Sequence, residues 1–329
     1  MPSHSRFMMA NLVLRPTYSD SSNFLTFIIP AADGCNLSCS YCIIAQRQEI
    51  TRKTLNPKDY VAFIEGAAAH THISAIAIQG YEPLLPSSLP YSAAILSAGQ
   101  DLGIPCTLVT NGVHLMSALE PLTKFNPNRI GVSLDAAALE RHDKLRGTAG
   151  AWAQTTKGIA AAASRFANSG TKLTVISTAM PGHAAYLLEM PALLRNLGVR
   201  DWIVNPLMSI GAGKPGEFNG HANRILKDLA LFQEAADREG VDLTIDDEFD
   251  LLRPCLTEAQ LAQYSTLNVR KLPPGATISR LLPSGHCSAG KELLSTLSDH
   301  APRWRPENEA PAQFYRRVTR TAPNLAHAA

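Results

Sequence analysis

Three cysteines near the start of the chain, Cys35, Cys39 and Cys42, lie on one short segment. Thiolates are the usual ligands of iron–sulfur clusters, and a four-iron cluster normally takes four of them. Three thiolates on one loop therefore leave one iron for a distant protein ligand or for a bound small molecule. Half of a zinc site is the alternative, but zinc usually takes four ligands and no nearby cysteine or histidine completes the set. The spacing favours an iron–sulfur cluster with an open metal position.

The elements that would position these cysteines alternate in type. Short apolar segments typical of a parallel sheet alternate with helical patterns. One helix is expected to start at Asn56-Pro57 and another to run from His183 to Leu197, ending at Gly198. The expected strands are Phe24–Pro30, Ile73–Gln79, Pro105–Thr110, Arg129–Leu134, Leu173–Ala179 and Trp202–Leu207. Six such units predict an α/β fold, a partial (βα)6 barrel.

Small polar residues and tight turns follow the expected strands. The cysteine segment follows the first strand, and strand ends on one face of a parallel barrel converge in space. The residues at the next three strand ends are Gly80, Tyr81, Glu82 and Pro83, then Thr110, Asn111 and Gly112, then Ser133, Leu134 and Asp135. We expect these residues to surround the cysteines.

With these motifs and the segment from His142 to Arg146, the chain resembles the radical S-adenosylmethionine (SAM) superfamily over roughly residues 23–210. It looks closest to the branch that contains the molybdenum-cofactor cyclase and peptide-modifying enzymes. The resemblance implies one [4Fe-4S] cluster held by the three cysteines, with SAM chelating the fourth iron. It further implies that reduction cleaves SAM to a 5′-deoxyadenosyl radical, which abstracts hydrogen from a substrate.

The resemblance also suggests roles for single residues in cofactor binding. Tyr41 would lie near the adenine, and the Gly80–Pro83 turn, with Tyr81 and Glu82, would present backbone groups to the methionine ammonium. Ser133 would contact the ribose or the carboxylate of SAM, and Arg146 would pair with that carboxylate. Tyr81 replaces the family's usual second glycine, so the backbone there must avoid left-handed dihedrals.

Some residues at the strand ends also have a simpler interpretation. The Thr110-Asn111-Gly112 turn is as well explained as a tight loop as by a ligand site. Asp135 and Arg146 would equally serve as helix caps or as a surface pair.

The C-terminal third changes character after residue 215. We expect a helix at Ala222–Glu239, a strand at Val241–Ile245 and a hairpin around Thr277–Cys287. These elements define a small α+β appendage at 216–300, after a barrel at 23–215 and an N-terminal segment at 1–22. Residues 301–329 have little periodicity and are expected to form a partly ordered tail. The arginines of this tail would bind an anionic substrate or nucleic acid, or simply be solvated.

The remaining cysteines carry weaker signals. Cys106 lies in an apolar strand and is expected to be a core residue. Cys255 and Cys287 are too few for an ordinary second four-iron cluster unless another residue such as His286 assists, so we infer a single cluster. Cys287, on a Pro-Ser-Gly turn, is a candidate for returning a hydrogen atom to a substrate radical. Its alternative is a buried structural thiol.

The bulk composition narrows the classes of function. The chain has 329 residues, of which 45% are hydrophobic, and a formal charge of +2, which gives no general attraction to nucleic acid or acidic membranes. No segment is apolar for long enough to span a bilayer. Clustered cysteines in a chain of this size indicate reduced thiols and a cytoplasmic setting.

The substrate is less constrained than the cofactor. We expect a small metabolite that undergoes epimerisation, oxidation or rearrangement, with a flavodoxin or ferredoxin as electron donor. A peptide-modifying enzyme is the second hypothesis. The first 22 residues are too few for an N-terminal winged-helix peptide-binding module. A non-catalytic iron–sulfur or zinc protein is the alternative from another class.

Overall fold

The computed structural model describes residues 23–29, 35–42, 55–179, 184–206, 222–247, 252–271, 276–289 and 301–321. The expected N-terminal segment at 1–22 and the expected boundary at residue 215 lie outside these residues. None of the helices in the described part has the length and apolar composition needed to cross a membrane.

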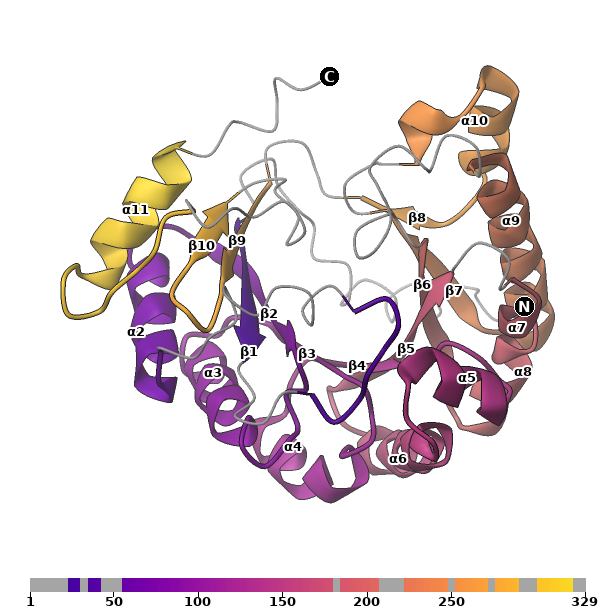
Figure 1. Cartoon of the computed structure of the whole chain (residues 1–329), viewed down its shortest axis with the longest axis horizontal. Helices are drawn as coiled ribbons and strands as arrows, with labels where there is room; N and C mark the ends of the chain where they lie inside the picture. Colours follow the sequence, from indigo (N-terminus) through magenta and orange to yellow (C-terminus); the bar gives the residue numbers. More distant parts are fainter. Residues whose placement is uncertain are drawn as a thin grey trace, which may run out of the picture.

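A single curved sheet of ten strands forms the centre of the molecule, in the order β10-β9-β1-β2-β3-β4-β5-β6-β7-β8. Every neighbouring pair is parallel except β9 and β10, which are antiparallel. The strands are β1 Asn23–Ile29, β2 Ile73–Gly80, β3 Cys106–Thr110, β4 Arg129–Ser133, β5 Lys172–Ala179, β6 Asp201–Pro206, β7 Asp242–Asp246, β8 Val269–Arg270, β9 Thr277–Leu281 and β10 Cys287–Ala289. Figure 1 shows that the sheet lines the inner side of an open arch.

The helices lie on the outer side of this arch (Figure 1). They are α2 Pro57–Ala68, α3 Leu89–Asp101, α4 Leu119–Phe125, α5 Leu139–Arg146, α6 Ala151–Phe166, α7 Ala184–Leu187, α8 Met190–Asn196, α9 Ala222–Glu239, α10 Glu258–Tyr264 and α11 Pro311–Thr321, with short 3-10 turns η2 Met116–Ala118 and η3 Arg253–Cys255. The predicted start of α2 is confirmed, because Asn56 caps it in a reciprocal capping box and Pro57 is its first residue. The single helix predicted over 183–197 is instead two, and α8 begins beside Pro191.

The two faces of the sheet differ in exposure. Ile76, Leu108 and Val175 point toward the helices and are buried. Their neighbours on the other face, such as Ala77 and Ile176, are half-buried. The apolar core therefore lies between sheet and helices, whereas these side chains of the concave inner face are partly exposed.

The C-terminal segment extends both edges of this same sheet. Strand β7 adds to β6 and is followed by β8, while β9 pairs with β1 at the opposite edge and β10 closes that edge. The predicted strand near Val241–Ile245 and the hairpin around Thr277–Cys287 are thus present. Helix α11, which the sequence does not predict, packs on α2 through Phe314 and Tyr315, whose rings contact Phe63.

Candidate metal centre

The cysteine segment is held in place by the C-terminal end of α5. The backbone N–H of Ser38 donates to the carbonyl of Arg146 at 3.0 Å, and that of Ser40 donates to the carbonyl of Leu145 at 3.1 Å. Gly147 ends the helix with φ of 67°, and a Cβ there would lie 2.3 Å from the Ser38 oxygen. A glycine is needed at this position because both the dihedral and the close approach disfavour a side chain.

Cys35 lies beside the turns that follow β2 and β3. Its thiol donates to the carbonyl oxygen of Tyr81 at 3.2 Å. The side-chain nitrogen of Asn111 lies 3.9 Å from the Cys35 sulfur and donates to Asn36 Oδ1 at 2.8 Å. The strand ends therefore converge on the cysteines as the sequence predicts. Among the described residues only Asn126 has a positive φ without being glycine, so the expectation for Tyr81 is confirmed.

Glu82 joins these two turns from inside the protein. Its carboxylate is 1% exposed and accepts hydrogen bonds from the Thr110 hydroxyl, the backbone N–H of Asn111 at 2.7 Å and that of Leu84 at 3.0 Å. Burial raises the pKa of Glu82, while these hydrogen bonds act in the opposite direction. Thr110 and Glu82 thus position Asn111, and their own polar atoms point into the structure.

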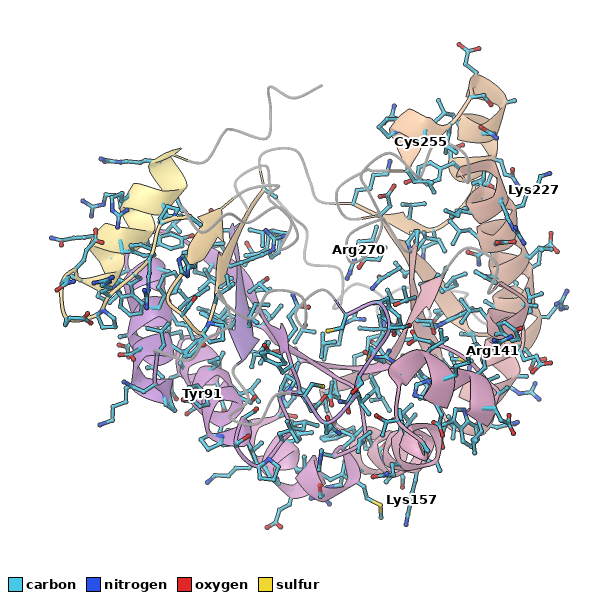
Figure 2. The ribbon with its side chains drawn as sticks, viewed as in Figure 1. Tyr91, Arg141, Lys157, Lys227, Cys255 and Arg270 are labelled. Carbon is cyan, nitrogen blue, oxygen red and sulfur yellow. The ribbon has the colours of Figure 1, made fainter. Side chains whose placement is uncertain are left out.

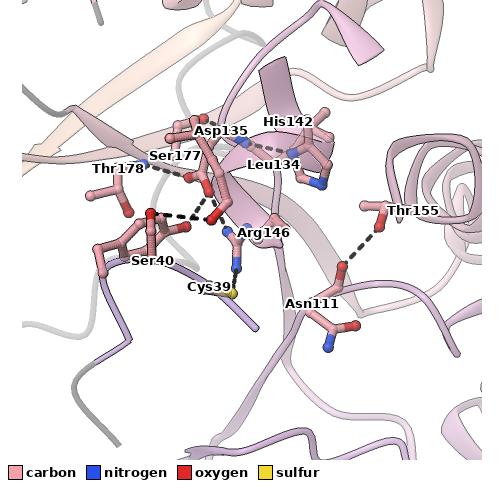
Figure 3. Close-up of polar contacts among 12 residues, drawn as sticks. Cys39, Ser40, Asn111, Leu134, Asp135, His142, Arg146, Thr155, Ser177 and Thr178 are labelled. Carbon is pink, nitrogen blue, oxygen red and sulfur yellow. Dashed lines mark hydrogen bonds and ion pairs between the residues drawn. The ribbon is translucent and has the colours of Figure 1, made fainter. Parts of the chain in front are cut away.

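Cys39 lies beside a buried ion pair. Arg146 Nη2 is 2.7 Å from Asp135 Oδ2, and Arg146 Nη1 is 3.9 Å from the Cys39 sulfur. Figure 3 shows the guanidinium between the carboxylate and the sulfur. The Tyr41 hydroxyl donates to the same carboxylate, and its ring lies 5.6 Å from the guanidinium. Asp135 and Arg146 do pair with each other, but in the interior and not at the surface.

This pairing bears on the roles expected for Tyr41 and Arg146. Burial, followed by the charge of Asp135, raises the pKa of Tyr41, so its phenol is a neutral donor. Arg146 already uses one nitrogen on Asp135 and directs another at Cys39. Its expected pairing with the SAM carboxylate would have to share the guanidinium with these groups.

The three thiols suit an iron–sulfur cluster chemically. None of them forms a disulfide, and soft thiolate ligands select such clusters. Burial is the main cause that raises the pKa of Cys35 to about 11, and the charges of Glu82, Cys39 and Cys42 act in the same direction. A bound metal ion would stabilise the thiolate forms. Within the described part of the chain, no three thiol, imidazole or carboxylate groups lie together in a way that would hold one single metal ion.

The other predicted site residues are spread more widely. Ser133 ends β4 and pairs in register with Ile176, on the inner face. Cys287 is 0% exposed in β10, opposite Leu281 and within the apolar core, and burial raises its pKa to about 12. This placement matches the alternative of a structural thiol. Cys106 is also buried in the core, as expected.

Cys255 and Cys287 lie at opposite ends of the sheet. Cys255 is in η3 near α10, whereas β10 forms the other edge (Figures 1 and 2). The two cysteines therefore do not share a site.

The sequence assigns no role at the centre to Thr178 or Asn36, and it offers His142 only as part of the segment that carries the resemblance. Thr178 donates its backbone N–H to Asp135 Oδ1 at 2.9 Å, and His142 Nδ1 accepts from the backbone N–H of Asp135 at 3.2 Å. Asn36 accepts from Asn111. Thr178 is the last residue but one of the fifth predicted strand, Leu173–Ala179, and this place near a strand end is the signal for it in the sequence.

Comparison with known proteins identifies a domain. The sequence profile of the Radical SAM superfamily matches residues 29–184, which include the three cysteines and the strand ends around them. This part of the chain is a radical SAM domain. The chain is 34% identical over 127 residues to the AdoMet-dependent heme synthase of Methanosarcina barkeri, covering 38% of this chain and 35% of that protein. It is also 32% identical over 122 residues to a probable GTP 3',8-cyclase of Methanococcus vannielii, covering 37% of this chain and 40% of that protein.

These alignments span about a third to two fifths of the curated relatives. Solved structures extend the likeness of fold to most of the chain. Streptococcus suis SuiB bound to precursor peptide SuiA matches with a TM-score of 0.64 at 14% identity, over 90% of this chain and 65% of that one. Native anSMEcpe with bound AdoMet and Cp18Cys peptide matches with a TM-score of 0.58 at 14% identity, over 93% of this chain and 81% of that one. At this identity the likeness concerns the fold alone.

Proposed function

We propose that this protein is a radical SAM enzyme in which Cys35, Cys39 and Cys42 hold a single [4Fe-4S] cluster. The observation that carries the proposal is that Cys35 contacts the turns after β2 and β3, while Cys39 lies beside the buried Arg146–Asp135 pair at the end of β4. When bound, the cluster supplies the electron that cleaves SAM to a 5′-deoxyadenosyl radical able to abstract hydrogen. A flavodoxin or ferredoxin is proposed to reduce it.

In this scheme the residues of the chain bind SAM and orient it. Gly80, at φ of 133°, shapes the turn after β2 next to Cys35, where backbone groups would meet the methionine ammonium. Ser133 lies on the inner face, where it would contact the ribose or the carboxylate of SAM, and Tyr41, which donates to Asp135, would lie near the adenine. The curved sheet behind them shields a reactive species from bulk water.

The substrate is proposed to bind along the inner face of the sheet. Ala77, Val109 and Ile176 are half-buried, apolar residues of that face. Asn205 of β6 contributes a buried side-chain oxygen that has no hydrogen-bond partner in the described structure. Arg270 extends from β8 toward the inside of the arch (Figure 2). A mixed apolar and polar surface of this kind suits a small metabolite with a polar group.

The curated relatives support a small molecule, since two of them carry the names of a heme synthase and a GTP cyclase. A peptide substrate is the second candidate, because structural neighbours with the same fold hold peptides. Competition between a peptide library and a metabolite pool for 5′-deoxyadenosine formation would separate the two.

The test is anaerobic reconstitution of the full chain with iron and sulfide. We expect about four irons per chain, an EPR signal of the reduced protein that changes when SAM is added, and release of 5′-deoxyadenosine. Cys39→Ala should abolish all three. Cys106→Ala, which removes a buried thiol on β3, is the matched control and should abolish none. A spectrum unmoved by SAM would favour a non-catalytic iron–sulfur protein, and one zinc per chain would favour the zinc alternative.

A further inference from the structure

Two side chains direct N–H groups at the sulfur atoms of cluster cysteines. Asn111 Nδ2 lies 3.9 Å from Cys35 Sγ, and Arg146 Nη1 lies 3.9 Å from Cys39 Sγ. We propose that Asn111 and Arg146 set the reduction potential of the cluster, with the charged contact of Arg146 having the larger effect. This inference rests on the proposed function, because it requires a cluster at these cysteines.

The position of Arg146 is fixed by its buried surroundings. The residue is 8% exposed, and its Nη2 is bound to Asp135 at 2.7 Å. The side chain of Asp135 is itself 0% exposed and accepts further hydrogen bonds from the Tyr41 hydroxyl and from the Thr178 backbone. The guanidinium is therefore held against Cys39, with the carboxylate behind it (Figure 3). Asp135 is a positioning residue in this arrangement.

Three hydrogen bonds hold Asn111 in place, one to its side chain and two to its backbone. Its Oδ1 accepts from the backbone N–H of Val113 at 3.0 Å, and its own backbone N–H donates to Glu82. The backbone oxygen of Asn111 accepts from the Thr155 hydroxyl at 2.9 Å. With Oδ1 used in this way, Nδ2 faces the cysteine segment.

Hydrogen bonds to the sulfurs and local net charge are known determinants of cluster potentials. Reduction adds one electron from the external low-potential donor, with no bond broken and no proton transferred. A positive charge or N–H dipole aimed at the sulfur stabilises this added charge, and burial reduces screening by water. Losing Arg146 or Asn111 should therefore make the potential more negative. Losing the charge of Asp135 should make it less negative.

The variants should shift the reduction potential of the cluster in opposite directions. EPR-monitored redox titration of the reconstituted full chain without SAM measures these shifts. Arg146→Met should lower the ratio of reduced to oxidised cluster about tenfold at a fixed potential, which is about 59 mV for a one-electron couple. Asn111→Leu should also make the reduction potential more negative, but by a smaller amount. Asp135→Asn should shift it the other way, and Arg146→Lys should remain near wild type.

Arg129→Met is the matched control. Arg129 forms a comparable pair with Asp201 at 2.7 Å, at the N-terminal ends of the strands and away from the cysteines. Its loss should leave the potential unchanged. If Arg146→Met does not load iron, Asn111→Leu and Asp135→Asn still decide the sign pattern.

Two results would overturn the inference while leaving the proposed function intact. One is a common potential in all variants that load four irons. The other is a shift in the same direction for Asp135→Asn and Asn111→Leu, which would point to a merely structural role. Failure of the wild-type chain to load iron would instead remove the proposed function.

Discussion

His142 makes the stability of the apoprotein depend on pH in a defined direction. The imidazole is 0% exposed, and its Nδ1 accepts a hydrogen bond from the backbone N–H of Asp135. Burial, followed by the charge of Arg146, lowers the pKa of His142 from 6.5 to about 4. The folded protein therefore holds this histidine neutral under conditions in which the unfolded chain would protonate it.

The size of the effect follows from linkage. Between pH 6.5 and 4 the unfolded state binds a proton that the folded state does not, so the free energy of unfolding falls as pH is lowered. The two pKa values differ by about 2.5, and each pKa unit corresponds to about 1.4 kcal/mol. His142 should thus contribute a loss of about 3 kcal/mol by pH 4, and no further change above pH 7.

The assay is urea unfolding of the apoprotein at several pH values between 4 and 7.5. The matched variant is His142→Asn, whose amide oxygen can accept from the Asp135 N–H but does not titrate. Other ionisable groups act equally in both proteins, so the difference between their pH profiles isolates the histidine. Parallel profiles for the two proteins would refute a depressed pKa at this position.

Three further outcomes are expected. Glu82→Gln should lower the free energy of unfolding by about 2–4 kcal/mol in urea, because an amide cannot accept all three buried hydrogen bonds, and a loss below about 1 kcal/mol would contradict this. Gly147→Ala should lower the free energy of unfolding by about 1–3 kcal/mol and reduce the iron content, because its Cβ would meet Ser38. The control is Gly103→Ala, which should leave the iron content unchanged, because Gly103 has a similar φ of 66° but open space around its Cβ position. Cys287→Ala should keep the cluster, the cleavage of SAM and the formation of product, because the thiol is buried in the core. Loss of the product alone would support the role of Cys287 as hydrogen donor.

The sequence is informative where short-range patterns carry the physics. The capping box at Asn56 and the proline after it begin α2 as predicted. The apolar segments predict β1 to β6 to within one residue at each end that the structure describes. The cysteine spacing and the polar strand ends locate the metal centre, because parallel strands bring their C-terminal ends to one side by geometry alone.

Long-range pairings are not contained in such patterns. The sequence offers Asp135 and Arg146 as caps or surface charges, and only the packing of α5 against the cysteine segment makes them a buried pair beside Cys39. In the same way, the apolar setting of Cys287 follows from the packing of α11 and β10.

The residue types and their spacing by themselves determined the class of chemistry, because three thiols on one loop and a series of strand ends are local features of the chain. The tertiary structure alone decided which side chains face the sulfurs and how the C-terminal strands are shared between the two edges of the sheet. Those outcomes depend on register and packing between residues far apart in the sequence, whose free energies no local pattern encodes.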